Sequence, residues 1–445
     1  MRRSLQMAAA GGIAVILLSG VAVADPLQPL PLHRALNLAL ERNGELRAMK
    51  EEQGRHEGER LTASTRPNPL LELEGSSGAP FGTAEDYGVS LGLSQEFVTA
   101  GKLTKRRMVA DRALEAYQWR LADRKRLLIE EVTVAYRELQ FCAKRSELAA
   151  TARDLSRQLL SVATERFNAD DIPELELNLA KVAQARSDAR ILEAQRELLP
   201  ARTRLAELTG EGAQVEVEVK VEVEVEVEPL RAPLPPLPEL LEGLELRRPD
   251  LRALATERAK GEAEQEAARA DAIPNVTASL FYRHDEMTFE IDRSQGLKRD
   301  NTLGVRFSIP LPLFDRNQGR IREATARTSQ SQREYETAVT AARREVATAH
   351  ARLQLSEKLL NLYDREILPQ LDENLKLMGE AYRVGEVGLL SVIEEQRKFM
   401  ELHDGYLAEL KSGQIARSRL ESAAGIPHSP PPFPTPGVPL PGGAP

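Results

Sequence analysis

The 445-residue chain has little cysteine, few aromatic residues and no surplus of positive charge, and each shortage argues against a class of protein. A single cysteine, Cys142, permits no internal disulfide and no zinc site built from several cysteines. An aromatic share of 4% is low for a porin made from one chain, whose barrel carries girdles of aromatic residues. A net charge of -8 argues against nucleic-acid binding, which needs a clustered basic face.

Motifs for catalysis and for cofactor binding are also lacking. Gly101-Lys102 is without the other residues of a phosphate-binding loop, and the segment 75–78 does not have the spacing of a nucleophile elbow. No two histidines are three or four residues apart, so there is no helical pair for zinc; they are His33, His56, His284, His350, His403 and His428. We expect no enzymatic activity, no cofactor and no metal site.

The first 24 residues have the features of an export signal. Arg2 and Arg3 precede an apolar stretch over 8–23, and Ala22-Val23-Ala24 fits the small-x-small pattern of a cleavage site. The alternative is a membrane anchor, for which the apolar stretch is short, since a span needs about 20 residues. We expect cleavage near Ala24. Because no cysteine stands at that point, we expect no lipid on the new N-terminus.

Two long stretches predict very long helices. Residues 103–167 contain neither proline nor glycine, and Leu148, Leu155 and Val162 recur at the seven-residue step of a coiled coil. The second stretch, 320–384, is interrupted only by Pro369 and Gly379. At 1.5 Å per residue each would be about 96 Å long, which a compact domain cannot use. Shorter helices are predicted at 33–64, 174–209, 238–272 and 389–424.

Four short segments alternate apolar with polar or small residues and predict strands. They lie within 70–74, 89–94, 275–282 and 303–309. One interpretation is an ordinary half-buried sheet. The other is a barrel wall that faces lipid outside and water inside.

The order of elements occurs twice along the chain. Residues 43–46 correspond to 248–251, and the separation grows only from 205 residues (Asn43 to Arg248) to 216 (Tyr87 to Leu303). Likewise Phe167–Ile172 corresponds to Tyr382–Val387. We therefore predict two structural repeats, 25–210 and 238–425, each with the order helix, strand, strand, long helix, shorter helix.

The remaining segments have biased composition. The inter-repeat linker, 211–237, contains an almost strict Val/Glu alternation over Val215–Glu228 and then a proline-rich stretch. The alternation fits either a strand with one charged face or a low-complexity expansion without function. Residues 426–445, rich in proline and glycine, are predicted to be a disordered tail.

One corner motif is specific enough to suggest a family. The run from Ile309 to Ile321, IPLPLFDRNQGRI, resembles the strand-to-helix corner of the CzcC-like branch of the TolC family of outer-membrane efflux proteins, a branch that serves heavy-metal pumps. Gln95-Glu96-Phe97 before Gly101-Lys102 is a looser counterpart, and Arg248-Pro249-Asp250-Leu251 is also similar to the family's pattern. The resemblance extends over roughly residues 30–425.

The resemblance implies a mainly α protein with a small β part. Three identical chains would contribute four strands each to a 12-stranded β-barrel in outer-membrane lipid, and the helices would form a long coiled-coil barrel across the periplasm. The duct would pass heavy-metal cations such as cobalt, zinc or cadmium, delivered by an inner-membrane pump of RND type and a periplasmic membrane-fusion adaptor. Alternatives are the same duct serving drug efflux or type I protein secretion, and, less favoured, a soluble periplasmic coiled-coil protein.

The resemblance also implies where solute enters. The segments Asn168–Pro173 and Arg383–Gly388 would be the periplasmic tips, with Gly385 and Gly388 allowing tight turns. Acidic residues ring the entrance in this family. One such position falls on Glu394 and the other on Ser391, which departs from the two-acid pattern. Further candidates for an acidic mouth are Glu386, Asp170 and Asp171.

Two expectations concern the ends of the duct. We expect the outward-facing barrel loops at Ser76–Asp86 and Asp285–Asn301. To build a wall of uniform height, we expect helix 33–64 to stack end to end with 389–424, and 238–272 with 174–209. Each stack would be about 100 Å long, which matches the long helices.

Overall fold

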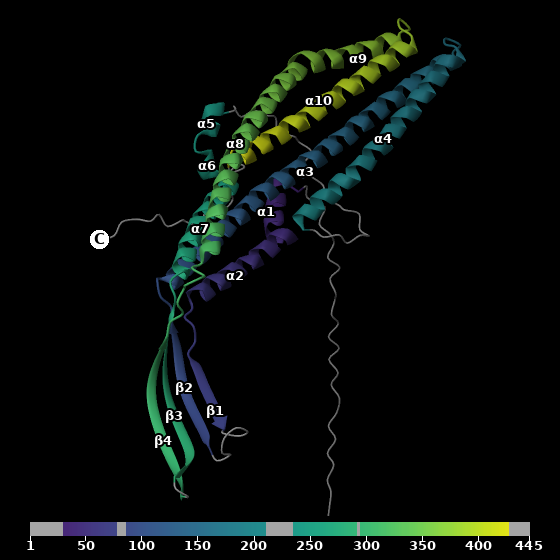
Figure 1. Cartoon of the computed structure of the whole chain (residues 1–445). Helices are drawn as coiled ribbons and strands as arrows, with labels where there is room; N and C mark the ends of the chain where they lie inside the picture. The colour runs from purple at the N-terminus through teal and green to yellow at the C-terminus, as the bar shows by residue number, and fades with distance from the viewer. Residues whose placement is uncertain (1–29, 78–85, 211–234, 292–293, 427–445) are drawn as a thin grey trace, which may run out of the picture.

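The structure is a computed structural model, and it describes residues 30–77, 86–210, 235–291 and 294–426. The described part is mainly helical with one small sheet. The helices form an elongated bundle, and the sheet extends from one end of it (Figure 1). The export signal, the Val/Glu alternation and nearly all of the proline-rich tail lie outside the described residues.

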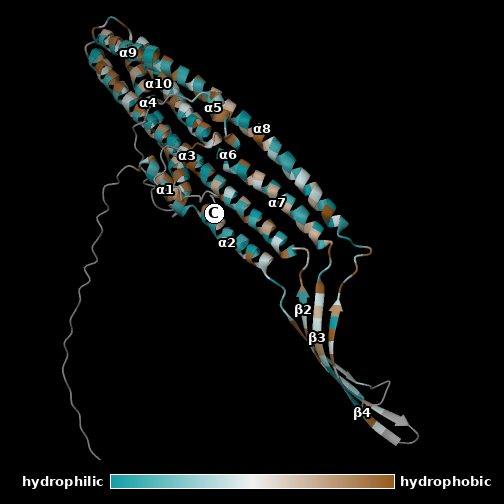
Figure 2. Cartoon of the chain, turned by 90° about the vertical axis from the view of Figure 1, so that its left-hand side faces the viewer, coloured by the Kyte–Doolittle hydropathy of each residue, from teal (hydrophilic) through white to brown (hydrophobic). Residues whose placement is uncertain are grey.

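Four antiparallel strands form the sheet in the order β1-β2-β3-β4. They are β1 (Leu70–Ser77), β2 (Tyr87–Phe97), β3 (Val276–Ile291) and β4 (Ser294–Ser308). No described helix covers either face (Figures 1 and 2). The apolar residues of the alternating pattern are therefore exposed, Val89, Leu91 and Leu93 on β2 among them. An ordinary half-buried sheet would hide these side chains, so the structure favours the barrel-wall interpretation.

The expected loop Asp285–Asn301 is wrong, because most of it is strand. Asp285 pairs with Asp300 and Met287 with Lys298. The two strands therefore continue until only two residues of the chain, between Ile291 and Ser294, separate them. Cross-strand contacts stabilise this extension, including an ion pair between Glu286 Oε1 and Arg299 Nε at 2.6 Å. Charged residues interrupt the apolar alternation in this part of the sequence, and the predicted strands were therefore too short. In the first hairpin, β1 likewise continues to Ser77.

The first long helix is continuous and the second is not. Helix α3 extends over Lys102–Asn168, close to the predicted 103–167. The second stretch is divided into α8 (Gln318–Leu362), a π-helical turn (Tyr363–Ile367) and α9 (Leu368–Arg383). Pro369 explains the interruption, since it has no N–H to donate to the carbonyl of Arg365. Gly379, the other expected interruption, lies inside α9 without breaking it.

The shorter helices on the sheet side are broken where the two repeats correspond. The predicted helix 33–64 is α1 (Leu32–Arg42) and α2 (Gly44–Ser64), and the predicted helix 238–272 is α5 (Leu237–Leu241), α6 (Leu244–Arg247) and α7 (Pro249–Asp271). Asn43 separates α1 from α2 and caps α2 by accepting a hydrogen bond from the N–H of Leu46. Arg248 separates α6 from α7.

The expected stacking of helices is wrong, because the partners are exchanged. Helix α4 (Glu174–Thr209) ends against α1 and α2, and α10 (Leu389–Ala423) ends against α6 and α7. A glycine with positive φ lies at each of these contacts. The backbone of Gly210 packs closely against Arg42, and that of Gly425 packs closely against Arg247. Helix lengths alone fit both pairings. The close backbone approach at these glycines selects the observed one.

Candidate functional site

Two turns lie together at the end of the bundle opposite the sheet (Figures 1 and 2). The first joins α3 to α4 and the second joins α9 to α10. Both have the same backbone structure. Asp170 (φ 57°) and Gly385 (φ 82°) are left-handed, and the N–H groups of Asp171 and Glu386 each donate to the carbonyl five residues earlier at 2.9 Å. These are the contacts of a Schellman motif, and they confirm the correspondence between 167–172 and 382–387.

The residue that starts the next helix is also equivalent in the two turns. Pro173 precedes α4 and Gly388 precedes α10, and both are extended. The first turn places Asp170 in the left-handed region at some cost in strain, while Gly385 adopts it freely. Asn168, the last residue of α3, is exposed. Both predicted segments therefore form turns between helices, and their role as periplasmic tips stays a prediction.

One side-chain contact that the sequence did not predict holds the two turns together. A guanidinium nitrogen of Arg166, near the end of α3, donates to the carbonyl oxygen of Tyr382 at 3.1 Å. The same guanidinium lies over the Tyr382 ring, 5.1 Å from its centroid. The two residues are 216 positions apart, so no local pattern could reveal the contact. It connects the first hairpin to the end of α9.

Tyr382 is the centre of an apolar cluster beneath the turns. It is 1% exposed and packs with residues from α3, α4 and α10, among them Ala163, Leu177 and Leu389. Burial raises the pKa of the Tyr382 phenol, against the opposing effect of Arg166. Its hydroxyl has no hydrogen-bond partner within the described structure. The phenol therefore stays neutral, and the residue serves packing.

All five predicted entrance residues are exposed at this end of the molecule. Asp170, Asp171 and Glu386 lie on the turns, while Ser391 and Glu394 lie three residues apart on one face of α10. None of the four carboxylates forms an ion pair with a residue that the structure describes. Glu395 differs, because it is mostly buried and pairs with Lys398 at 3.3 Å. The four unpaired carboxylates outnumber the two arginines beside the turns, Arg166 and Arg383, so the tips carry net negative charge.

Further from the tips, one arginine connects three helices. Arg145 of α3 contacts Glu197 of α4 at 2.7 Å and Asp404 of α10 at 3.2 Å. The three side chains are about one-third to two-fifths exposed. The partners are far apart in the sequence and each is one of many charged helix residues, so the sequence carried no signal for this contact.

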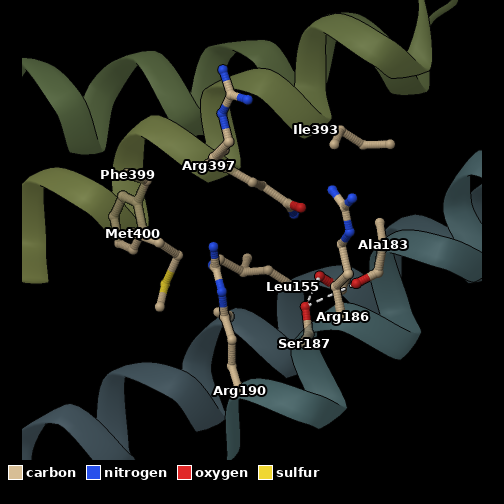
Figure 3. Close-up of a pocket in the computed structure, with 12 residues that line it drawn as sticks. Leu155, Ala183, Arg186, Ser187, Arg190, Ile393, Arg397, Phe399 and Met400 are labelled. Atoms are coloured by element: carbon tan, nitrogen blue, oxygen red, sulfur yellow. Dashed lines mark hydrogen bonds between the residues drawn. The ribbon is translucent and has the colours of Figure 1, made fainter. Parts of the chain in front are cut away.

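A pocket lies between Arg145 and the tips, where α4 faces α10 (Figure 3). The hydroxyls of Ser156 and Ser187 are 2.7 Å apart in its floor, and Arg186 and Arg190 extend from α4 toward α10. Its volume is about 80 Å³. The lining includes no acid–base pair and no nucleophile beside a base, so we assign it no catalysis.

Two features are absent from the part of the chain that the structure describes. No group of three or more His, Cys, Asp or Glu side chains is placed there to hold a metal ion. Nor does that part of the chain include a helix both long and apolar enough to cross a membrane.

Comparison with known proteins places this architecture in a family. A model of the outer membrane efflux protein family matches residues 35–211 and 240–426. The cobalt-zinc-cadmium resistance protein CzcC of Cupriavidus metallidurans is 25% identical over 399 residues, which is 89% of this chain and 90% of that protein. The pyoverdine export outer membrane protein OpmQ of Pseudomonas aeruginosa is 25% identical over 71% of this chain and 63% of its own length.

Solved structures have the same fold. The channel protein CusC superimposes with a TM-score of 0.72 at 20% identity, over 89% of this chain and 92% of its own. This fold and family are those of channels and not of enzymes. With two tip turns at one end, an uncovered four-stranded sheet at the other and a family match over most of its length, the chain belongs to the outer membrane efflux protein family.

Proposed function

We propose that three copies of this chain form a passive duct through the outer membrane. The sheet has two unpaired edges, β1 and β4, and four strands cannot close on themselves. Pairing β4 of each copy with β1 of the next removes every edge and makes a 12-stranded barrel. The exposed apolar residues on β2 and β4 then face outer-membrane lipid. The helices extend into the periplasm as a tunnel.

The energy and the first selection of cargo come from partners. A periplasmic membrane-fusion adaptor contacts the tips, and an inner-membrane pump of RND type delivers the cargo. Three exposed apolar residues near the two turns, Leu175, Val384 and Leu390, support an adaptor contact there. The sequence has no phosphate-binding loop to couple transport to nucleotide hydrolysis, and the duct itself is proposed to be passive.

The proposed cargo is heavy-metal cations such as cobalt, zinc or cadmium. Two observations support this: similarity to a cobalt-zinc-cadmium resistance protein along 90% of that protein, and unpaired carboxylates at the tips. Threefold symmetry would repeat each carboxylate around the entrance. Like charges gathered at a narrow mouth repel one another and attract cations.

The proposed entrance consists of Glu394 and Ser391 on α10, with Glu386, Asp170 and Asp171 on the turns. Glu394 supplies the negative charge of the ring. Ser391, one turn away on the same face, supplies a neutral hydroxyl, so the ring carries less charge than a two-acid gate. No residue needs to coordinate the metal, because a duct has only to let the ion pass.

Growth of a deletion strain tests the cargo. The strain is grown across gradients of zinc, cobalt, cadmium and copper, and separately with dyes and detergents. Sensitivity to metals alone, reversed by the intact gene, is the expected result. Sensitivity to dyes and detergents alone would overturn the metal assignment while leaving the duct.

A second candidate cargo is a small organic molecule, which the similarity to a pyoverdine export protein favours. That similarity extends over a smaller share of both chains than the match to CzcC does. Secretion of a polypeptide, or a soluble periplasmic role, lacks such an observation. Retention of a fluorescent organic chelator in the deletion strain, with normal metal tolerance, would favour this candidate.

We further propose that the chain is exported by a signal that is cleaved near Ala24, and that no lipid is attached to the new N-terminus. The residues that support this are Arg2, Arg3, the apolar stretch 8–23 and the absence of cysteine at the cleavage point. Mass spectrometry of the N-terminal peptide from isolated outer membranes tests both statements. An acylated N-terminus, or one that begins at Met1, would contradict them.

A further inference from the structure

The apolar face of β4 continues beyond the end of the strand. On β4, Leu303, Val305 and Phe307 are exposed at alternate positions. The strand ends at Ser308, yet the same spacing of every second residue continues through exposed apolar residues as far as Leu313. The next residue, Phe314, is 92% exposed. We call these residues the apolar corner: Ile309, Leu311, Leu313 and Phe314.

The apolar corner has a fixed shape. Pro310 and Pro312 restrict its backbone, and the N–H of Leu313 donates to the carbonyl of Leu311 at 2.8 Å. Asp315 accepts from the N–H of Asn317, and the Asn317 amide donates to the carbonyl of Ala268 in α7 at 2.7 Å. The corner is therefore fastened to the bundle, and its apolar side chains are presented to the outside.

Basic residues follow directly. Arg316, Arg320 and Arg322, which we call the basic flank, are all exposed. Arg316 and Arg322 form no ion pair within the described structure, and Arg320 makes only a 3.9 Å contact with Asp271. The nearby acids do not neutralise the flank.

These acids have other partners. Asp315 bonds Asn317, and Glu323 pairs with Arg327 at 2.9 Å. Asp315 keeps its negative charge, because its partner is a neutral N–H, but one carboxylate beside three arginines leaves the basic flank with a net positive charge.

The equivalent corner of the first repeat lacks this combination. There Phe97 is exposed, but Thr99 donates to the carbonyl of Pro274 at 2.7 Å, and Lys102 is 5% exposed and bonds Asn275 at 2.6 Å. The polar groups of the first corner thus form hydrogen bonds within the protein and are not presented to the outside. The exposed arginines that follow this corner are ion-paired, Arg106 with Asp271 at 3.1 Å and Arg107 with Asp111 at 3.7 Å. Of the two corners, the second therefore combines a run of exposed apolar residues with arginines that the described residues leave unpaired, so this arrangement is not a requirement of the fold.

We propose that the apolar corner and the basic flank form a binding site for anionic phospholipid in the leaflet that faces the helices. The apolar side chains enter the hydrocarbon edge, in continuity with the lipid-facing stripe of β4. The guanidinium groups bind the lipid phosphates by charge-assisted hydrogen bonds. This inference rests on the proposed placement of the sheet in the outer membrane. It assigns to three arginines a role that closing a barrel does not need.

Tryptophan fluorescence tests the apolar part, because Trp119 is the chain's single tryptophan. In a W119F background, tryptophan is placed at position 314 (F314W), and the protein is reconstituted with brominated phospholipid. We expect strong quenching. F307W on the strand is the positive control, and L175W at the tips is the negative control. Quenching of F307W without quenching of F314W would overturn the proposed contact between the apolar corner and lipid. Absence of quenching in both variants would instead contradict the placement of the sheet in lipid.

Retained lipid tests the basic part. Protein purified in mild detergent from vesicles of phosphatidylethanolamine and phosphatidylglycerol is analysed for bound lipid. The double substitution R316Q/R322Q should lower bound phosphatidylglycerol several-fold. The matched control is R186Q/R190Q, which removes two exposed, unpaired arginines near the tips and should change nothing.

Equal retention by both variants would overturn the headgroup assignment. A photo-cross-linking residue at position 314 identifies the remaining alternative. An adduct with a second copy of the chain, in place of lipid, would show that the apolar corner is a protomer interface and would overturn the proposal.

Discussion

Arg166 donates a hydrogen bond to the carbonyl oxygen of Tyr382 at 3.1 Å and covers that residue's ring, which ties the first tip hairpin to the end of α9. Substitution of glutamine at position 166 should loosen the tips, since a hydrogen bond from a charged donor contributes about 1.5–3 kcal/mol. We expect faster amide hydrogen exchange over 380–392 and no change in the sheet. Unchanged exchange at the tips would mean that the contact carries no stability.

The glycines that close the two helix stacks are expected to be sensitive. G210A and G425A each force a side chain into a left-handed backbone, where the new Cβ of residue 210 would lie 2.7 Å from the Arg42 carbonyl oxygen. We expect each to lower the free energy of unfolding by more than about 1 kcal/mol. G379A is the matched control, because it lies inside α9 in open space.

Alanine at position 379 should stabilise by up to about 1 kcal/mol. Thermal unfolding of the three variants in one detergent checks the set. Equal midpoints for all three would contradict the assigned packing at the ends of α4 and α10.

Asp250 should make part of the free energy of unfolding depend on pH in the acidic range. Burial opposes its charged form, but the hydrogen bonds and charge of Arg248, the charge of Arg126 and a backbone hydrogen bond from Leu251 together outweigh burial and lower the pKa of Asp250 in the folded state. A lowered folded pKa gives stability that is present above the ordinary value, near 3.9, and is lost as the pH falls through the folded value. The thermal unfolding midpoint should therefore decrease when the pH is lowered below about 4. D250N should flatten that dependence, and a wild-type slope in D250N would contradict this assignment.

Arg145 offers a test of coupling between α3 and α10. Its contact with Asp404 is partly exposed, so a double-mutant cycle with R145Q and D404N should give a coupling energy of about 0.5–1 kcal/mol. The coupling should shrink at high salt. Additive effects of the two substitutions, at low and high salt alike, would show that the ion pair does not hold the helices.

The proposed entrance predicts a change in ion selectivity. E394Q removes one carboxylate per chain from the tips and should reduce the preference for cations in single-channel recordings. S391D should increase it. E334Q is the control, because Glu334 is exposed on α8 and accepts a hydrogen bond from Gln330 within the same helix. If neither E394Q nor S391D changed the preference for cations, the residues that set ion selectivity would lie elsewhere in the duct.

Much of this architecture could be predicted from local patterns. The absence of proline and glycine over 103–167 predicted α3 almost to the residue, because helix continuity depends on local backbone chemistry. The turns at 168–173 and 383–388 were located by residues that break helices and permit left-handed φ. The exposed alternation on β2 and β4 indicated a sheet with an apolar outer face.

Other features depended on contacts between distant segments. The exchanged stacking of α4 and α10 is set by the close approach of Gly210 to Arg42 and of Gly425 to Arg247, which no periodicity reveals. Both strands of the β3–β4 hairpin were predicted, but their extension was missed because charged residues such as Glu286 and Arg299 pair across the strands there. The entrance residues came from a resemblance, and their role remains a prediction.

The number of copies in the detergent-solubilised particle tests the central claim most directly, because the duct exists only if separate chains close one barrel. Native mass spectrometry of protein extracted from outer membranes should give three chains, and extraction should require detergent. A single chain, or release into buffer without detergent, would contradict the account.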